Sequence, residues 1–234
     1  MKLTFKNKTV LVTGGTRGIG KQIANDFHKL GAKVYISGRT KPSWELPKNM
    51  SFISADFSDD WSNLYNIIQI ITFDIIINNA GINIIKNMKD VSTEDYDKIS
   101  NVNLKVPYII TSDSNIKEGG RIVNISSIWS VKTKKNRSLY TTMKNGIIGL
   151  TKSSSVDLSD RNILVNSVSP GFTETELTDK SLSSEEKKEL SDQVPLGRFA
   201  KTEEISNVVL FLCSDLNTYI TGQNIIVDGG FTNI

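Results

Sequence analysis

The chain has 234 residues, of which 38% are apolar and 23% charged, so it is long enough for one α/β domain with a proper core. Its net charge of +3 is small and the two signs are interspersed, which argues against a nucleic-acid binder. A single cysteine, Cys213 in an apolar run, excludes an internal disulfide and favours a buried, inert thiol in a reducing compartment. No apolar stretch is long enough for a signal peptide or a membrane span, so we expect a cytoplasmic protein that binds neither nucleic acid nor membrane.

The first elements predict a βαβ unit with a glycine-rich turn. A strand over 8–12 leads into the turn, which is followed by a helix over about 19–30 and a strand over 33–37. Glycines between strand and helix let the backbone approach a diphosphate, which the free N–H groups of the helix N-terminus can hold. The spacing G-x-x-x-G-x-G differs from the commoner G-x-G-x-x-G, and a plain glycine-rich turn is the alternative. We interpret it as a cofactor-binding turn formed by Gly14, Thr16, Arg17, Gly18, Ile19 and Gly20.

The tip of the second strand predicts which nicotinamide cofactor is preferred. Folds of this type that prefer NAD carry an acid at that tip, whereas an arginine accommodates the 2′-phosphate of NADP. The tip reads Ser37-Gly38-Arg39 without an acid, and Arg17 in the glycine turn could reach the same phosphate. We therefore expect NADP(H) to be preferred over NAD(H). The alternative is that either arginine is a solvated surface residue.

Strands and helices keep alternating along the rest of the chain. The connection after Arg39 contains two prolines and no helical period, so a loop replaces the expected crossover helix. Ser92-x-x-Asp95 is a capping pattern that opens the helix containing Asn103, and Gly119-Gly120 is expected to break the chain before the next strand. The polar stretch 172–195 is expected to form a mobile helical flap. The remaining strands are predicted over 50–55, 73–77, 121–125, 163–168 and 224–227, and the remaining helices over about 60–71, 138–158 and 203–214.

Repeated β-α units predict a Rossmann-type doubly wound parallel sheet, flanked by helices, in a single domain over 1–234. Sheets of this kind bind ligands at the carboxyl ends of their strands. The candidate site residues follow strands and would therefore meet at that edge: the glycine turn, Arg39, Asp56, Asn79, Ser127 and Pro170-Gly171.

The central candidate is the set Ser127, Tyr140 and Lys144. Tyr140 and Lys144 lie four residues apart in a run with helical periodicity, so both side chains fall on one helix face. We expect the ammonium to lower the pKa of the phenol from about 10 and to make it a usable proton donor near neutral pH. A Tyr-x-x-x-Lys pair alone occurs often by chance on surface helices, so this interpretation depends on the residues around it.

Over essentially its whole length the chain resembles the short-chain dehydrogenase/reductase family. TGGTRGIG, NNAG, Asn103, the Ser127/Tyr140/Lys144 set, SPG and VDGG occur in the family's order. NILVNSVSPGF, PLGRF and ITGQNIIVDGG make it most similar to the 3-oxoacyl-acyl-carrier-protein reductase-like branch. The resemblance implies an enzyme that transfers hydride between a nicotinamide and a carbonyl or secondary alcohol. It also implies a homo-oligomer, either a tetramer or a dimer, and no metal.

The resemblance also implies roles for individual residues. Tyr140 would donate the proton, Ser127 would hydrogen-bond the substrate oxygen, and Lys144 would bind ribose hydroxyls and depress the Tyr140 pKa. Asn103 would hold a water that relays protons. Further cofactor contacts would come from Asp56 and Phe57 at the adenine, from Asn79, Ala80 and Gly81 at the ribose near the nicotinamide, and from Pro170, Gly171 and Thr173 at the nicotinamide.

The loop between Ser127 and Tyr140 departs from the family's pattern. Residues 129–137 carry a tryptophan and four cations, where relatives usually have small or aliphatic residues. A solvated loop is one interpretation. The other is an anionic substrate whose phosphate is drawn by Lys132, Lys134 and Lys135 while Trp129 stacks on a sugar or base.

Three functions stay open at this point. The first is the reduction of acyl-carrier-bound 3-oxo chains, and the second is oxidoreduction of a sugar, a sugar nucleotide or another small carbonyl. The third is a catalytically silent NADP-binding scaffold, which an intact Ser127/Tyr140/Lys144/Asn103 set argues against.

Overall fold

A seven-stranded parallel sheet forms the centre of the molecule, with the strand order β3-β2-β1-β4-β5-β6-β7. This arrangement comes from a computed structural model in which residues 3–176, 178 and 182–234 are described. The strands are β1 (Thr9–Val12), β2 (Lys33–Gly38), β3 (Met50–Ser54), β4 (Phe73–Asn78), β5 (Ile116–Ile125), β6 (Leu164–Pro170) and β7 (Asn224–Val227).

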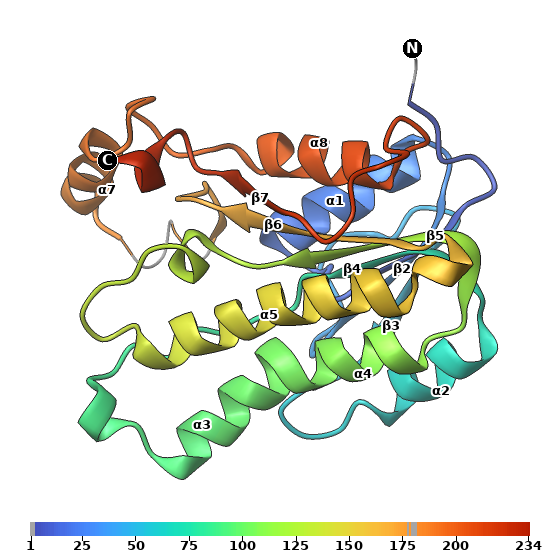
Figure 1. Cartoon of the computed structure of the whole chain (residues 1–234), viewed down its shortest axis with the longest axis horizontal. Helices are drawn as coiled ribbons and strands as arrows, with labels where there is room; N and C mark the ends of the chain where they lie inside the picture. Colours follow the sequence, from blue (N-terminus) through green and yellow to red (C-terminus); the bar gives the residue numbers. More distant parts are fainter. Residues whose placement is uncertain (1–2, 177, 179–181) are drawn as a thin grey trace.

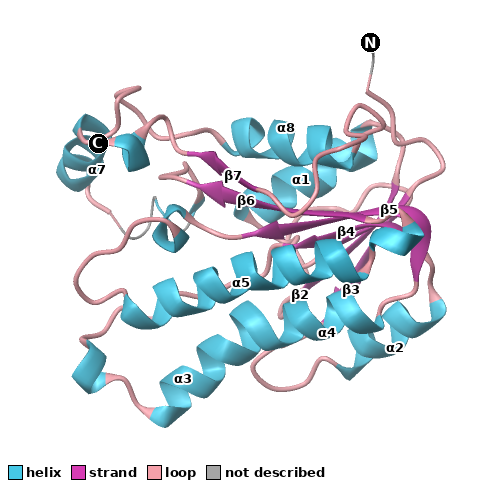
Figure 2. Ribbon diagram, viewed as in Figure 1, coloured by secondary structure: helices cyan, strands magenta, loops and turns pink. Residues whose placement is uncertain are grey.

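Helices cover both faces of the sheet (Figures 1 and 2). One face is covered by α1 and α8, which also pack on each other, and the other by α2, α4 and α5. The predicted doubly wound sheet is therefore confirmed. The α-helices are α1 (Gly18–Lys29), α2 (Ser62–Ile70), α3 (Thr93–Ser100), α4 (Val106–Asp113), α5 (Ser138–Asp157), α7 (Ser184–Asp192) and α8 (Thr202–Cys213).

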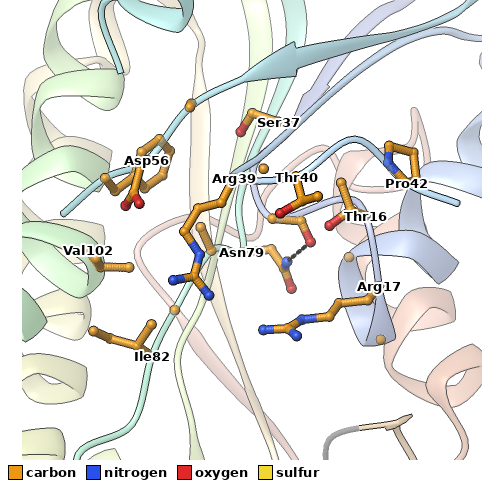
Figure 3. Close-up of a pocket in the computed structure, with 18 of the residues that line it drawn as sticks. Thr16, Arg17, Ser37, Arg39, Thr40, Pro42, Asp56, Asn79, Ile82 and Val102 are labelled. Carbon is orange, nitrogen blue, oxygen red and sulfur yellow. Dashed lines mark hydrogen bonds between the residues drawn. The ribbon is translucent and has the colours of Figure 1, made fainter. Parts of the chain in front are cut away.

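The strand order reverses next to β1, which pairs with β2 on one side and with β4 on the other. Connections leaving neighbouring strands at such a switch point diverge to opposite faces of the sheet, so a crevice opens at their carboxyl ends. A pocket lies at this place (Figure 3). The alternation of elements thus determines where a ligand can bind.

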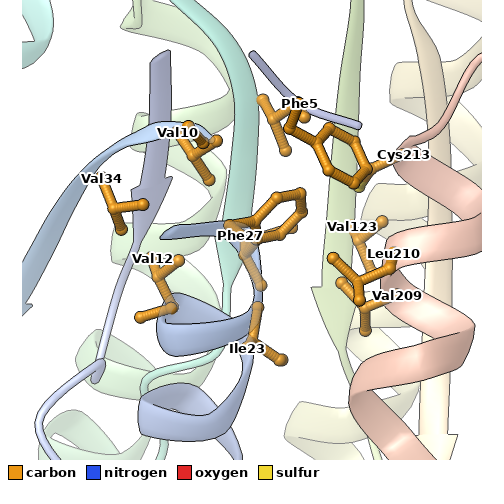
Figure 4. Packing of buried hydrophobic residues seen from close by; sticks show 14 of the residues in the cluster. Phe5, Val10, Val12, Ile23, Phe27, Val34, Val123, Val209, Leu210 and Cys213 are labelled. Atoms are coloured by element: carbon orange, nitrogen blue, oxygen red, sulfur yellow. The ribbon is translucent and has the colours of Figure 1, made fainter. Parts of the chain in front are cut away.

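The core on the α1/α8 face explains why the first strand–helix unit forms (Figure 4). α1 directs Ile23 and Phe27 toward the sheet, and both side chains are fully buried. The ring centroids of Phe27 and Phe5 lie 4.7 Å apart in an edge-to-face arrangement. Cys213 on α8 is buried in the same cluster, and burial raises the pKa of its thiol, as expected for an inert cysteine.

The predicted element bounds agree with the structure to within a few residues, and the connection between β2 and β3 is a loop as expected. The capping box of Ser92 and Asp95 is present. One prediction is wrong: Gly119 and Gly120 do not precede the fifth strand but lie inside β5. The register between β4 and β5 shifts there, and Gly119 takes a left-handed φ of +73°, so the glycines form an irregularity rather than an end.

The segment 172–195, predicted to be a helical flap, contains α7. The helix begins with a capping box between Ser183 and Glu186. Residues 177 and 179–181 of this segment lie outside the described residues. In Figure 1, α7 lies on the side to which the carboxyl ends of β6 and β7 point. Among the described helices, none has both the length and the apolar character needed to cross a bilayer.

Candidate active site

A groove of about 510 Å³ lies over the carboxyl ends of β1, β2, β3 and β4. Its walls contain every predicted cofactor residue that precedes Ile82 in the chain, from the glycine turn to the segment after β4. These residues are Gly14, Thr16, Arg17, Gly18, Ile19, Gly20, Arg39, Asp56, Phe57, Asn79, Ala80 and Gly81.

The glycine turn is held against the end of β4 by close backbone contacts. Asn79 Nδ2 donates to the carbonyl oxygens of Thr13 and Gly14 at 2.9 and 3.1 Å, and Thr13 Oγ1 accepts from the Asn79 and Ala80 amides. A Cβ added to Gly14 would lie 2.9 Å from Ala80 Cα, and one added to Gly20 would lie 2.3 Å from Asn79 Nδ2. The turn therefore requires glycine because it packs directly on the neighbouring strand end.

The N-terminus of α1 faces this groove with unsatisfied donors. Its N-cap residue, Arg17, makes no side-chain capping hydrogen bond, and the first turn contains no acidic residue. The first amides of the helix thus remain available to an anionic group, which the helix dipole also favours.

Positive charge gathers at one end of the groove. The side chains of Arg17 and Arg39 extend into the same space from the glycine turn and from the end of β2 (Figure 3). Asp56 lies on the side of Arg39 away from Arg17 (Figure 3), and it accepts hydrogen bonds from the Ser58 amide at 2.9 Å and the Ser58 hydroxyl at 2.6 Å. These bonds, with smaller contributions from the charges of Arg39 and Lys98, hold the pKa of Asp56 below its usual range despite its partial burial.

The residues present fit a dinucleotide. Ser37 Oγ lines the groove, is buried, and has no hydrogen-bond partner among the described residues. A buried hydroxyl without a partner is costly, and a ligand hydroxyl or phosphate in the groove would supply one. The free amides of α1, the two guanidiniums and this hydroxyl together suit a bound diphosphate and ribose.

Ser127, Tyr140 and Lys144 come together beside the groove wall at Gly81. Tyr140 and Lys144 are on α5, and Lys144 Nζ lies 5.6 Å from the centroid of the Tyr140 ring. Ser127 is close enough to the Tyr140 hydroxyl to lower its pKa, which partly offsets the effect of burial. A Cβ built on Gly81, in the groove wall, would lie 3.6 Å from Lys144 Nζ. Lys144 therefore lies against the groove wall at Gly81, although none of the three catalytic candidates lines the groove itself.

The predicted lowering of the Tyr140 pKa by Lys144 is wrong for this arrangement. Burial raises the pKa of Tyr140, and the Ser127 hydrogen bond and the Arg137 charge oppose that shift only in part. Lys144 Nζ is placed over the ring and donates to the Ile125 carbonyl at 2.8 Å instead of approaching the hydroxyl. Burial also lowers the pKa of Lys144 to about 8.

Asn103 lies in a short π-helical segment, η2 (Asn101–Lys105), between α3 and α4. Its side chain accepts from the Ile82 amide and donates to the Ile82 carbonyl, both at 2.8 Å. A Cβ on Gly81 would lie 3.7 Å from Asn103 Oδ1. Asn103 thus fixes the chain that follows β4 at the end of the groove, a contact that sequence reasoning did not predict.

Three predicted nicotinamide contacts are not part of the groove wall. Pro170 is the last residue of β6, and Gly171 packs so closely that an added Cβ would lie 2.8 Å from Asp228 Cα. Thr173 is buried and donates to the Gly171 carbonyl at 3.1 Å. Instead, Thr175 contributes to the wall from the same segment. The role of Pro170, Gly171 and Thr173 in binding a cofactor stays a prediction.

Of the two interpretations of the loop 129–137, the one in which Trp129 stacks on a substrate is contradicted by the burial of this side chain. Only 9% of this side chain is exposed, and its ring meets those of Phe231 and Phe172 edge to face at centroid distances of 6.3 and 6.5 Å. Lys134 Nζ and the Arg137 guanidinium lie over the ring, each 5.4 Å from its centroid. Trp129 therefore packs in an aromatic cluster with Phe172 and Phe231. The polar residues around it in the sequence did not indicate this buried position.

The cations of this loop face different partners. Lys132 Nζ donates to the main-chain oxygens of Phe231 and Ile234 and lies 5.0 Å from the centroid of the Phe231 ring. Lys135 is exposed. Arg137 alone among them acts on the Tyr140 hydroxyl through its charge. Lys132, Lys134 and Arg137 therefore all lie over rings of the cluster that contains Trp129 and Phe231.

Sequence reasoning missed several residues that line the groove. Ser58 could have been found, because a serine two residues after an aspartate often forms an Asx turn. Lys98 and Val102 gave no such signal, since their position depends on how α3 packs beside the strand ends. The other missed residues are Ser37, Gly38, Thr40, Lys41, Pro42, Ala55, Ile82, Thr175 and Glu176.

No group of three or more His, Cys, Asp or Glu side chains in the described part of the chain could hold a metal ion.

Comparison with known proteins identifies the family. A family profile described as enoyl-(acyl carrier protein) reductase matches residues 14–232. The chain is 41% identical to the 3-oxoacyl-acyl-carrier-protein reductase FabG of Aquifex aeolicus, over 98% of this chain and 99% of that protein. The chain belongs to the short-chain dehydrogenase/reductase family.

Further relatives agree with this membership. The FabG protein of Rickettsia felis is 38% identical over 97% of this chain and 98% of its own. The structure of a short-chain dehydrogenase family protein from Francisella tularensis has a TM-score of 0.88 and 32% identity, covering 97% of this chain and 99% of that chain. This short-chain dehydrogenase/reductase is thus an oxidoreductase of the FabG-like branch that acts on a carbonyl or alcohol with a nicotinamide cofactor.

Proposed function

We propose that the groove binds NADP(H) in preference to NAD(H). Arg17 of the glycine turn and Arg39 after β2 supply two guanidiniums to the groove, and the tip of β2, Ser37-Gly38-Arg39, carries no carboxylate to hold a free ribose 2′-hydroxyl. A structure from Agrobacterium tumefaciens, provisionally identified as a 2-deoxy-d-gluconate 3-dehydrogenase, contains bound NADP. It has a TM-score of 0.89 and 28% identity, covering 99% of this chain and 98% of that chain.

The preference is tested by equilibrium binding of NADPH and NADH to the Arg39→Gln variant. Loss of a charge-assisted hydrogen bond should weaken NADPH binding by about 10- to 100-fold and leave NADH binding nearly unchanged. Lys48→Gln is the matched control, because Lys48 is an exposed cation of the same loop that does not line the groove. Equal losses for both cofactors in Arg39→Gln would contradict the assignment.

For the reaction, we propose the reduction of a 3-oxoacyl group carried as a thioester on acyl carrier protein. The observation that carries this proposal is that Ser127 and Tyr140 gather with Lys144, whose ammonium lies next to Gly81 of the groove wall. The FabG relatives, at 34–41% identity over nearly the whole chain, support this substrate class.

The proposed mechanism follows from the state of the side chains. A reduced nicotinamide, when bound, supplies the hydride that reduces the carbonyl carbon. Tyr140 is protonated at neutral pH because burial raises its pKa, so it can donate a proton to the carbonyl oxygen. Ser127 hydrogen-bonds that oxygen as negative charge develops on it. The Lys144 ammonium would hold ribose hydroxyls, and Asn103 would hold the proton-relaying water.

A second candidate function is oxidoreduction of a sugar or another small carbonyl, including a sugar nucleotide. The provisional sugar-acid enzyme from Agrobacterium tumefaciens favours it, because that chain is as similar in fold as the Francisella tularensis protein. A silent NADP-binding scaffold is disfavoured by the intact set Ser127, Tyr140, Lys144 and Asn103. NADPH consumption with a panel of 3-oxoacyl thioesters and keto-sugars separates the first two functions. Turnover of keto-sugars alone would replace the 3-oxoacyl assignment.

We further propose a homo-oligomer, a tetramer or a dimer, that works in the cytoplasm and closes the segment 172–195 over its substrate. Phe211 on α8 and Ile226 on β7 are about 40% exposed, which supports packing of these elements against a second copy. Light scattering of the purified protein measures the number of subunits. A monomer at micromolar concentration would contradict the proposed assembly.

A further inference from the structure

A cluster of aromatic rings joins the loops that follow β5, β6 and β7. Trp129 comes from the first of these loops, Phe172 from the second and Phe231 from the third. The ring centroids lie 6.5 Å apart for Trp129 and Phe172, 6.3 Å for Trp129 and Phe231, and 5.1 Å for Phe172 and Phe231, in edge-to-face arrangements. Because β5, β6 and β7 are neighbours in the sheet, one cluster fixes three adjacent loops relative to one another.

Two of the catalytic candidates are attached to this cluster. Tyr140 packs against it. Ser127 Oγ accepts a hydrogen bond from the Trp129 amide at 3.2 Å, and the Ser127 carbonyl accepts one from the Ser130 hydroxyl at 2.7 Å. Because the amide hydrogen occupies one side of Ser127 Oγ, the hydroxyl hydrogen points elsewhere and stays available to a substrate oxygen. A shift of Trp129 would therefore move both the serine and the tyrosine that are proposed to act on the carbonyl.

Phe231 is held on both of its sides, and only 8% of it is exposed. The Asp228 carboxylate accepts hydrogen bonds from the Thr232 amide and hydroxyl, each at 2.7 Å, and these bonds close the turn that contains Phe231. Lys132 Nζ lies 5.0 Å from the centroid of the Phe231 ring and donates to the Phe231 carbonyl at 3.4 Å. Since Lys132 belongs to the same loop as Trp129, the turn after β7 and the loop after β5 hold each other in place.

We propose that Phe231 is a positioning residue, which acts through Trp129 to hold Ser127 and Tyr140 in the placement that proton transfer requires. This inference rests on the proposed reduction and adds a residue to it. Neither Phe231 nor Trp129 lines the groove, so a change at Phe231 should lower turnover and leave the binding of NADPH unchanged. A misplacement of reacting groups by about 1 Å can lower a rate by about 100-fold.

The test measures kcat, KM and the Kd for NADPH, with the 3-oxobutanoyl thioester of N-acetylcysteamine as substrate. Phe231→Ala should lower kcat by about 10- to 100-fold, while KM and Kd stay within about threefold of the wild-type values. Phe231→Leu keeps most of the apolar volume and should recover most of the lost kcat. Phe5→Ala is the matched control, because Phe5 is 2% exposed and has an edge-to-face partner in the core on the α1/α8 face. All variants are assayed well below their thermal unfolding midpoints.

The control separates positioning from stability. Phe5→Ala should lower the unfolding midpoint as Phe231→Ala does, yet keep kcat within about threefold of the wild type. Equal kcat losses in these two variants, or a loss in Phe231→Ala that is confined to KM, would overturn the positioning role. If Phe231→Ala does not fold, Lys132→Gln takes its place, because it removes the cation over the Phe231 ring and takes no ring out of the cluster. It should lower kcat about three- to tenfold relative to Lys135→Gln, an exposed cation of the same loop, and equal kcat in these two would likewise overturn the role.

A second substrate, 2,3-butanedione, separates this inference from the proposed reaction. If the wild type reduces the diketone and not the thioester, the proposed 3-oxoacyl reduction fails, and the comparison of Phe231→Ala with Phe5→Ala is made on the diketone. If the wild type reduces the thioester and Phe231→Ala has the same kcat, the proposed reaction stands and the role of Phe231 is overturned. A wild type that reduces neither compound would overturn both.

Discussion

Replacing Lys144 by methionine tests the electrostatics of the site. Lys144 is 3% exposed, and its ammonium makes one hydrogen bond, to the Ile125 carbonyl at 2.8 Å. Burial lowers its pKa from 10.5 to about 8, so the protein carries a desolvated charge at neutral pH. We expect the Lys144→Met variant to lose activity without losing stability at neutral pH.

The expected change in the free energy of unfolding follows from the lowered pKa of Lys144. Below about pH 8 the folded and unfolded chains both hold the proton, and the depressed pKa corresponds to a penalty of about 3 kcal/mol on the folded state. Between about pH 8 and 10 the unfolded chain keeps this proton while the folded chain releases it. The free energy of unfolding therefore rises with pH, by about 1.4 kcal/mol per unit from this group. Methionine does not titrate, so Lys144→Met removes this pH dependence of the free energy of unfolding. In the variant the Ile125 carbonyl loses its hydrogen bond, which destabilises the fold by about 1–3 kcal/mol.

Urea unfolding of both proteins across about pH 7 to 9.5, followed by tryptophan fluorescence, measures this difference. The wild type should gain about 2 kcal/mol relative to Lys144→Met over the interval from about pH 8 to 9.5. The pH range of the experiment ends below the pH at which the Tyr140 hydroxyl titrates. Because burial raises the pKa of Tyr140, this group would lower the free energy of unfolding only at higher pH. Parallel stability curves for the two proteins would refute the assignment of Lys144 as a buried cation with a depressed pKa.

Two further substitutions test the glycine turn. Gly20→Ala places a Cβ 2.4 Å from the Gly14 carbonyl oxygen, so it should destabilise the fold by about 1–3 kcal/mol and weaken NADPH binding. Gly149→Ala on α5 is the control, because the added Cβ has no neighbour within 4 Å, and this variant should be more stable by about 0.4–1 kcal/mol. Equal thermal unfolding midpoints for Gly20→Ala and Gly149→Ala would contradict the packing argument. Trp44→Phe removes the indole donor to the Thr16 carbonyl at 3.2 Å, and we expect it to raise the Kd for NADPH about three- to tenfold. An unchanged Kd, measured by fluorescence titration, would show that the loop does not hold the turn.

Much of the fold follows from local signals in the sequence. Glycines placed between an apolar strand and an amphipathic helix indicate a βαβ unit, and β4 contains the apolar run 75–77 because both of its faces are covered there. The loop after Arg39 was predicted correctly, since two prolines leave no helical period there. Gly119 was misread because a glycine that ends a strand and one that forms a bulge look alike in sequence.

The chemistry of the candidate site was only partly predictable. Spacing brings Tyr140 and Lys144 to one helix face, and Lys144 lies next to the groove wall at Gly81, although neither residue lines the groove. Their pKa values depend on burial by α5, the neighbouring strands and the Trp129 cluster, which no local pattern encodes. For the same reason the contact of Asn103 with Ile82 could not be foreseen, because it joins a π-helical segment to the chain after another strand.

The central claim is that the Tyr140 hydroxyl supplies the proton for a nicotinamide-dependent reduction. The most direct measurement follows NADPH consumption with a 3-oxoacyl thioester or a generic diketone, in the wild type and in Tyr140→Phe, alongside the NADPH Kd of each. We predict that Tyr140→Phe loses about 10²- to 10⁴-fold in kcat while its Kd for NADPH stays within about threefold of the wild-type value. Comparable kcat in the two proteins, or a wild type that takes up neither NADPH nor NADH, would contradict the account.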